Sequence, residues 1–393
     1  MKKSHSATSY IKSQLPAICS IIFLLLLGVY FYLLAHPAEE SSEFSSGYSL
    51  TYENAVVTEI LSDNCEPEDK KEGTLRGHQE LTALVETGPY AGNTYPISNL
   101  VGPLYGHRLS VGDYFIIGLS VYEEGQVYAT VYEYDRAPAI LILLGAFCLI
   151  TVLVGGKTGA KSLIGLLITI AALLLILLPL LFAGWPTLPT TLLVCSWIAC
   201  IVFLILSGWD KKTVCAILGT VAGMVFATLF ALLAQALLRI DGYREEYAEP
   251  LMQLRHTGES LVGIRYLLVA GVMISALGAV MDVAMSISSA IREISLVGEK
   301  LTFKQLFFSG MNIGRDMVGT MTNTLILAII GSGMMLIMYI ASLNLPLRQF
   351  LSSPYLALEI VSSLSSSIGV ILTVPLTAFI SAILYAYTAK EEA

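Results

Sequence analysis

A stripe of polar side chains runs through an apolar stretch at residues 277–293. Asp282, Ser286, Ser289 and Glu293 recur every three or four residues, so on a helix they share one face. A carboxylate surrounded by hydrocarbon is costly, and it is usually retained where a substrate, an ion or a proton must pass. Asp282 and Ser286 are therefore candidate residues for binding a substrate or an ion.

A second polar stripe follows at once, with Asp316, Thr320 and Asn323 on one helical face. We treat these three residues as further binding candidates, since the two stripes belong to consecutive predicted helices and face the same side of a membrane. Arg315 is expected to pair with Asp282 or with Glu293, which would lower the cost of burying the carboxylate. The alternative is that these groups satisfy one another and only hold two helices together.

The last apolar stretch carries a third polar set. Glu359 lies near its predicted outer end and shares a face with Ser363, Ser366, Thr373 and Thr377. An outer gate to the same polar site and an ordinary polar interface between helices explain this face equally well. Glu359 is included among the candidate binding residues.

Other chemistry has little support in the sequence. Residues 156–158, Gly-Lys-Thr, resemble the end of a phosphate-binding loop, but Thr151 stands where that motif needs a glycine. The six cysteines and five histidines form no HExxH or paired CxxC pattern, so we expect no metal site and no cofactor. Basic residues do not cluster with aromatic ones, which argues against a nucleic acid partner.

Composition indicates a membrane protein. Of 393 residues, 55% are hydrophobic and 13% are charged, whereas a typical soluble domain has about 25% charged residues. Eight apolar stretches are long enough to cross the roughly 30 Å of hydrocarbon in a bilayer. They lie at residues 15–35, 138–154, 163–182, 188–207, 213–238, 262–285, 317–341 and 356–388, and Pro375 predicts a kink in the last.

The first apolar stretch has two interpretations. A cleaved signal peptide would have an apolar part of roughly 7–15 residues followed by small residues at a cleavage site. Residues 15–35 are longer than that, and His36-Pro37 follows them. A retained membrane anchor behind a short polar tail is therefore favoured.

Residues 36–136 are predicted to form a soluble β-rich domain. Alternating patterns predict strands at residues 55–60, 80–86, 114–122 and 126–134, separated by turns that contain glycine. Short strands of this kind suggest a small barrel or sandwich, with an OB-like barrel as one form. Acidic residues outnumber basic ones, which favours a structural or partner-binding module over one that binds nucleic acid.

Lysine placement predicts the orientation. Every lysine outside the β segment falls on one side of the predicted spans, and the positive-inside rule makes that side cytoplasmic. The sequence therefore predicts a polytopic α-helical membrane protein with about eight transmembrane helices and a small external β domain. Its predicted parts are a cytoplasmic tail (1–14), an anchor (15–35), an extracellular β domain (36–136) and a seven-helix membrane domain (137–393) with a cytoplasmic C-terminus.

Several motifs resemble the YibE/F family of bacterial multi-spanning membrane proteins. They are residues 278–294 (GAVMDVAMSISSAIREI), residues 314–328 (GRDMVGTMTNTLILA) and the stretch that begins at Glu359. Residues 111–118 (VGDYFIIG) are similar to the external domain of the longer family members. The resemblance implies a bacterial plasma-membrane protein of the kind described as a transporter or efflux component. It also implies a partner, either a shorter YibE/F-like protein or a second copy.

Three functions are consistent with these residues. The leading hypothesis is a permease or efflux component in the lipid bilayer, with an acidic intramembrane site for an unidentified ion or small molecule. The alternative is a scaffold or sensor subunit that binds a partner through its external domain and transports nothing. A weaker alternative is an intramembrane aspartyl-type hydrolase, in which Asp282 and Asp316 would share a proton.

Overall fold

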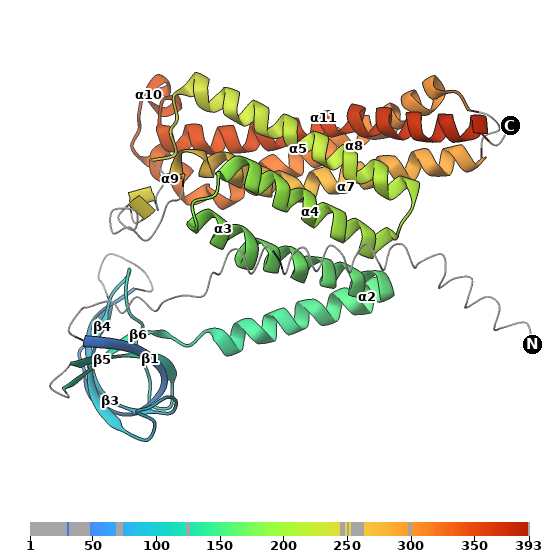
Figure 1. The fold of residues 1–393 in the computed structure, drawn as a ribbon. Helices are drawn as coiled ribbons and strands as arrows, with labels where there is room; N and C mark the ends of the chain where they lie inside the picture. Colours follow the sequence, from blue (N-terminus) through green and yellow to red (C-terminus); the bar gives the residue numbers. More distant parts are fainter. Residues whose placement is uncertain are drawn as a thin grey trace, which may run out of the picture. The chain divides into compact units, whose positions relative to one another are not determined.

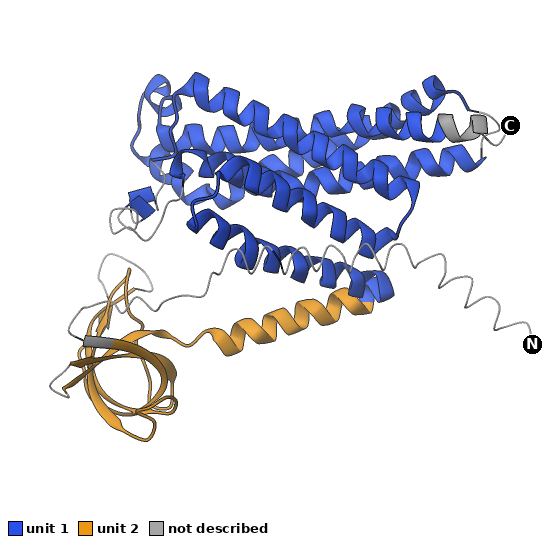
Figure 2. Ribbon diagram, in the orientation of Figure 1, with its two compact units in different colours: residues 1–38, 154–393 blue, residues 39–153 orange. Residues whose placement is uncertain are grey.

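The computed structural model describes residue 30 and residues 48–67, 74–122, 126–243, 248–249, 251–252, 263–297 and 301–391. Residues 39–153 form one compact unit, and residues 1–38 with 154–393 form the other, as Figure 2 shows. Apart from Tyr30, the predicted tail and anchor lie outside the described residues.

The smaller unit contains an antiparallel β half-barrel (Figure 1). Its strands are β1 (Tyr48–Asp63), β2 (Glu66–Pro67), β3 (Leu75–Val85), β4 (Thr94–Val101), β5 (Tyr114–Tyr122) and β6 (Val127–Tyr134). The main sheet has the order β4-β3-β1-β5-β6, and the short β2 pairs with the start of β3. Alternate residues of the strands point inward, and Val57, Leu81, Phe115 and Ile117 are buried in the core.

Four strands differ from the prediction: β1 and β3 begin earlier than expected, and β2 and β4 were not predicted. β1 begins at Tyr48 because its first half pairs with β5, a long-range contact that short-range alternation does not reveal. No strand was predicted over β4, which contains Pro96, a residue that is unfavourable in the interior of a sheet. The structure tolerates Pro96 because β4 forms a ladder with β3 alone among the described strands.

A buried polar network fixes the segment that connects β4 to β5. The Gln79 side chain on β3 is fully buried, and its amide nitrogen donates to Asp63 (3.1 Å) and to the Leu109 carbonyl (3.0 Å). Its oxygen accepts hydrogen bonds from the Leu109 N–H (2.9 Å) and from Asn99 (3.1 Å). Arg108 pairs with Asp63 at 2.9 Å. One side chain thus holds a loop and two strands in place.

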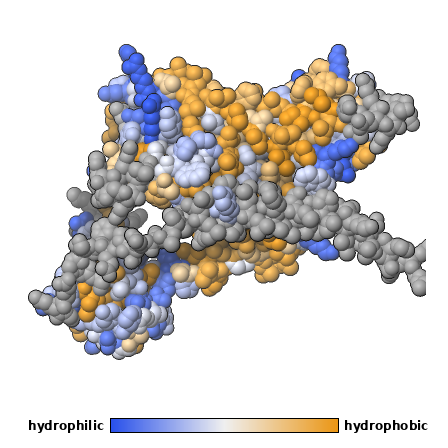
Figure 3. Space-filling view, in the orientation of Figure 1, coloured by the Kyte–Doolittle hydropathy of each residue, from blue (hydrophilic) through white to orange (hydrophobic). Residues whose placement is uncertain are grey.

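The larger unit is helical. Its regular elements, including the one that joins it to the β domain, are α2 (Ala137–Ala172), a π-helical turn (Leu173–Leu177), α3 (Leu178–Phe182), α4 (Thr187–Ser207), α5 (Lys211–Leu238), a 3₁₀ turn (Ile264–Tyr266), α7 (Leu267–Val297), α8 (Phe303–Ser332), α9 (Met334–Ser342), α10 (Leu347–Leu351) and α11 (Pro354–Glu391). Apolar side chains gather over much of the visible face of this unit (Figure 3).

Five described helical segments are long and apolar enough to cross a membrane, or six if α8 and α9 count as one broken span. α4, α5 and α11 lie where spans were predicted, and α11 runs through Pro375 without interruption. The two spans predicted at 138–154 and 163–182 lie in one helical run, residues 137–182, whose backbone leaves helical geometry at Gly156 (φ 54°).

The predicted span at 317–341 is wrong as a single straight helix. α8 begins fourteen residues earlier, at Phe303, where Thr302 and Gln305 form a capping box. It ends at Ser332, and α9 departs from its axis by 62°. Gly331 and Gly333 flank this break, and glycine is among the weakest helix formers. α7, by contrast, stays helical to Val297, so residues 282–294 are a continuous helix.

Glycines let two helices, α5 and α8, pack closely against α11 (Figure 1). A Cβ atom at Gly219 or Gly223 of α5 would collide with Thr377 or Thr373 of α11. On α8, a Cβ atom at Gly314 would collide with Val374 of α11. The backbones of α5 and α8 therefore approach α11 more closely than any larger residue would allow.

Replacing Gln79 by Leu should loosen the β domain. The Leu109 N–H and the Asn99 amide would lose their buried partner, at about 1–3 kcal/mol for each unsatisfied group. Hydrogen exchange of the full-length protein should become faster across residues 102–113. Glu80→Leu, an exposed position next to Gln79 on β3, is the control and should leave this exchange unchanged. Equal exchange in both variants would contradict the role given to Gln79.

Replacing Gly223 by Leu should destabilise the helical unit by about 1–3 kcal/mol or more, because the side chain must displace α11. Thermal unfolding of the purified protein measures this loss. The matched control is Gly145→Leu on α2, where an added Cβ atom meets nothing within 4 Å. Adding Thr373→Ala to Gly223→Ala should recover part of the stability that Gly223→Ala alone loses. Absence of that recovery would contradict the close packing of α5 on α11.

Candidate functional site

Asp282 lies on an outward face of α7. This face is made of Gly271, Ser275, Gly278, Asp282 and Ser286, all of them exposed. The opposite face of the helix is buried against α4, α5 and α11. Within the part of the chain that the structure describes, no hydrogen bond or ion pair reaches the Asp282 carboxylate. The predicted stripe is thus a real helix face, which is exposed at Asp282 and Ser286 and borders α11 at Ser275.

The stripe on α8 is also exposed. Asp316, Thr320 and Asn323 lie on the side of α8 that faces away from α11, and Arg315 lies beside them. The Arg315 guanidinium donates to the side-chain oxygen of Asn312 at 3.3 Å. Among the described residues it forms no ion pair with Asp282 or Glu293, so the predicted charge pairing is not formed there.

α7 and α8 bring the two stripes to similar levels. Ile291 of α7 packs where a Cβ atom at Gly310 of α8 would lie, which fixes the relative height of these helices. The chain reverses direction between the two helices. Asp282 lies nine residues before this contact on α7, and Thr320 lies ten residues after it on α8, so both lie on the same side of the contact at similar distances along the helix axes. The polar residues thus share a depth, although no hydrogen bond or ion pair joins the two stripes among the described residues.

The prediction missed an ion pair at one end of the bundle. Arg292 of α7 meets Asp210 at 3.1 Å, and Glu293 lies 3.8 Å from the same Arg292 guanidinium. Asp210 is also the N-cap of α5 and accepts a hydrogen bond from the Lys211 N–H. Its position before an apolar helix was a signal for a cap in the sequence, but its pairing with Arg292 depends on tertiary packing.

The predicted polar face of α11 is divided among three environments. Thr373 and Thr377 face the glycines of α5, and the Ser366 hydroxyl lies 3.0 Å from that of Ser275 on α7. Glu359 lies elsewhere, and the Ser363 hydroxyl donates to the Glu359 backbone carbonyl at 2.8 Å. These residues therefore do not line one common cavity.

Glu359 lines a pocket of about 250 Å³ between α8, α9 and α11. Most of its wall consists of isoleucine and leucine side chains, among them Ile329, Ile337 and Leu356. Gly333, the residue at the break between α8 and α9, packs beside the carboxyl group, because a Cβ atom built there would lie 3.4 Å from the Glu359 Cδ. The helix break thus creates the space that the carboxylate faces.

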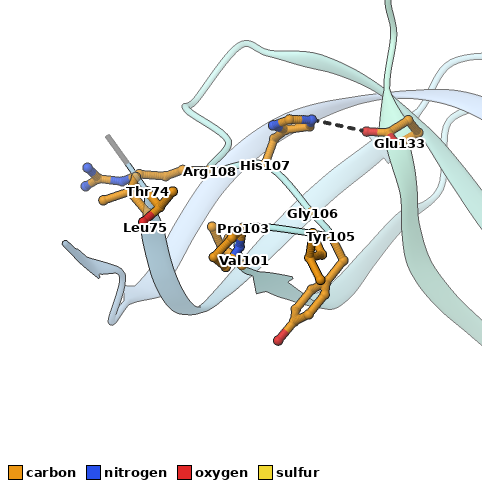
Figure 4. A pocket seen from close by; sticks show the side chains of 11 residues that line it. Thr74, Leu75, Val101, Pro103, Tyr105, Gly106, His107, Arg108 and Glu133 are labelled. Atoms are coloured by element: carbon orange, nitrogen blue, oxygen red, sulfur yellow. Dashed lines mark ion pairs between the residues drawn. The ribbon is translucent and has the colours of Figure 1, made fainter. Parts of the chain in front are cut away.

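The β domain has a groove of its own, about 350 Å³ in volume and shown in Figure 4. It lies along the segment after β4, with Tyr105 and His107 on that segment and Glu133 on β6. The charged groups in and beside it are already engaged. His107 and Arg136 both lie within 3.5 Å of the Glu133 carboxylate, and Arg108 pairs with Asp63. This arrangement favours a structural role for these charges.

The pairing of Glu133 affects its ionisation. A hydrogen bond from the Tyr134 N–H and the nearby Arg136 guanidinium hold the pKa of Glu133 below its usual value, against the opposing effect of partial burial. Across the described residues, no group of three His, Cys, Asp or Glu side chains lies close enough to hold a metal ion.

Comparison with known proteins identifies a family. The family model described as YibE/F-like protein matches residues 143–387, which cover the helical elements and leave the β strands outside the match. No curated protein matches the chain, and no solved structure matches it either.

Neutralising Asp282 should cost little stability, because its carboxylate has no partner in the described structure. Arg292→Gln removes one charge from the same helix and is the matched comparison, since it breaks the pair with Asp210 and should cost about 1 kcal/mol. Thermal unfolding of both variants in the same lipid environment measures the difference. If Asp282→Asn loses as much stability as Arg292→Gln, Asp282 is a structural residue and not a site residue.

Proposed function

The chain belongs to the YibE/F-like family, and from that premise and the geometry above we propose that it is a membrane transport protein, either a permease or an efflux component. The observation that carries this proposal is the Asp282 carboxylate, which sits on a long apolar helix and has no partner among the described residues. Ionisable groups in such helices usually serve the passage of an ion, a proton or a substrate.

The polar stripes of α7 and α8 would form the substrate pathway. Asp282 and Ser286 contribute from α7, and Asp316, Thr320 and Asn323 contribute from α8 at similar depth. An exposed carboxylate facing pure hydrocarbon would be unfavourable by several kcal/mol or more. A water-filled path along these faces removes that cost, which is why transport fits the structure better than a dry surface does.

The proposed membrane arrangement has eight spans. The helical run 137–182 would measure about 69 Å at about 1.5 Å per residue, more than twice the hydrocarbon thickness. We therefore divide it into two spans at Gly156, beside Lys157 and Lys161. The predicted anchor at residues 15–35 and the broken pair α8–α9 complete the set. The positive-inside rule then gives cytoplasmic termini in a bacterial plasma membrane, with the β domain outside.

The β domain is proposed to be an OB-like barrel. In an OB fold the first strand pairs with the second and fourth strands, and the order β4-β3-β1-β5-β6 fits this arrangement if β2 is left aside. β4 lies against β6, which nearly closes the barrel.

A scaffold or sensor is the alternative function, and one observation favours it. The outward positions of β5, of β6 and of residues 48–56 of β1 carry no charged residue, but they carry six exposed tyrosines: Tyr52, Tyr114, Tyr122, Tyr128, Tyr132 and Tyr134. Tyrosine is enriched in protein interfaces, so this face suits a partner protein. A hydrolase has less support, because no described hydrogen bond joins Asp282 to Asp316.

Thiol labelling tests the proposed pathway. Single cysteines at positions 282, 286, 316 and 323, in a variant lacking the six native cysteines, should react with a small water-soluble maleimide in intact membranes. Leu327→Cys lies on exposed α8 among apolar residues and should stay unlabelled, whereas Leu104→Cys on the β domain should be labelled from outside. Protection at all four positions, with Leu104→Cys labelled, would reject a hydrated pathway and favour the scaffold.

A further inference from the structure

We propose that the pocket around Glu359 binds a small lipophilic organic cation, such as a substituted ammonium ion. This inference rests on the proposed transport function and names a class of substrate for it. The proposal starts from the shape of the site, a pocket of about 250 Å³ enclosed by α8, α9 and α11 at the point where α8 breaks.

The lining of the pocket determines which part of a ligand contacts which group. Glu359 contributes a carboxylate, and Ile329, Ile330, Ile337, Leu356 and Ile360 contribute apolar surface. Ser363 also lines the pocket, but its hydroxyl is engaged with the Glu359 carbonyl oxygen. A ligand that fills this space therefore meets one negative charge and otherwise hydrocarbon.

The carboxylate is available for a ligand. No ion pair or hydrogen bond to its oxygens is found among the described residues, and Gly333, which offers no side chain, packs beside it. Gly333 is both the C-cap of α8 and the N-cap of α9, so the two helix ends at the break act in opposite directions on a nearby negative charge. Among the residues that line the pocket, no protein cation neutralises this carboxylate.

A small inorganic cation fits this lining poorly. Sodium, magnesium and calcium ions need several oxygen ligands to replace their water, and the pocket offers one carboxylate among apolar groups. An organic cation loses less hydration, and its apolar part gains contact with the isoleucine and leucine side chains. The volume lies below the roughly 300–1,000 Å³ of most ligand pockets, so the ligand should be small.

The route of entry also fits a lipophilic ligand. Ile330, Ile360 and Leu364 line the pocket and are 43%, 38% and 46% exposed, so the mouth of the pocket is apolar. A cation with an apolar body partitions into the bilayer and can enter from the side through such a mouth. A strongly hydrated ion gains nothing from this route.

The test measures binding of radiolabelled benzyltrimethylammonium to the full-length protein in lipid nanodiscs. Neopentylbenzene has nearly the same shape without the charge, and sodium has the charge without the apolar body, so both serve as competitors. We expect saturable binding that neopentylbenzene displaces at least about tenfold more weakly than unlabelled benzyltrimethylammonium, and that sodium does not displace. Glu359→Gln should weaken binding by at least about tenfold, and Glu359→Asp by less.

Two further variants keep the result interpretable. Ile330→Trp should fill the pocket and abolish binding while it keeps Glu359, and Asp241→Asn neutralises a carboxylate outside the pocket and should leave binding unchanged. Thermal unfolding confirms that each variant is folded. Binding that is absent, that Glu359→Gln does not change, or that sodium displaces would overturn the proposal.

The binding test and the thiol-labelling test can fail independently of each other. Failure of binding together with labelled thiols at positions 282, 286, 316 and 323 would reject the ligand class but keep the pathway. Binding together with protected thiols would keep the pocket as a cation site but reject transport along α7 and α8.

Discussion

The close contact between α5 and α11 determines how the helical unit is built. On α5, the residues at every fourth position from Cys215 to Ala231 are small, namely Cys215, Gly219, Gly223, Ala227 and Ala231, and all of them are buried. Gly369, Thr373 and Thr377 of α11 lie against them.

Hydrogen bonds do not explain the contact between α5 and α11. The Thr373 hydroxyl bonds to its own helix at Gly369, and the buried Thr377 hydroxyl has no partner within the described residues. Van der Waals contact between closely spaced backbones therefore holds the pair.

This packing explains why the polar residues lie where they do. α11 is in contact with α5, α7 and α8 together, and the glycines of α8 bring that helix equally close. Such a tightly packed centre leaves no space for a polar cavity. Asp282 on α7 and the polar stripe on α8 are consequently displaced to outward faces. The remaining space lies at the edge of the bundle, where α8 breaks and Glu359 faces an apolar pocket.

The sequence predicted what depends on local pattern and missed what depends on tertiary contacts. Hydrophobic runs located α4, α5 and α11 well, because length and apolarity are local properties. The same reasoning identified Asp282 and Glu359, since a carboxylate in an apolar run is visible without a structure. It did not reveal the 62° bend after Ser332, although Gly331 and Gly333 were a signal for it. The pairing of Arg292 with Asp210, and the absence of an Arg315 pair with Asp282, depend on which helices become neighbours.

The two carboxylates are surrounded by different groups, and this difference limits the mechanisms available. Asp282 lies on a helix face with hydroxyl and glycine neighbours, where water or a small ion can be accommodated. Glu359 lies among isoleucine and leucine side chains, where a hydrated ion would lose its water without replacement. A transporter that handled only a small hydrated ion would have no use for the second environment. A transporter that couples an apolar cation to a proton or a small ion would need both environments, the apolar one at Glu359 and the polar one at Asp282. Under the transport function proposed above, the placement of Asp282 on α7 and of Glu359 on α11 fits two kinds of cargo better than one shared site.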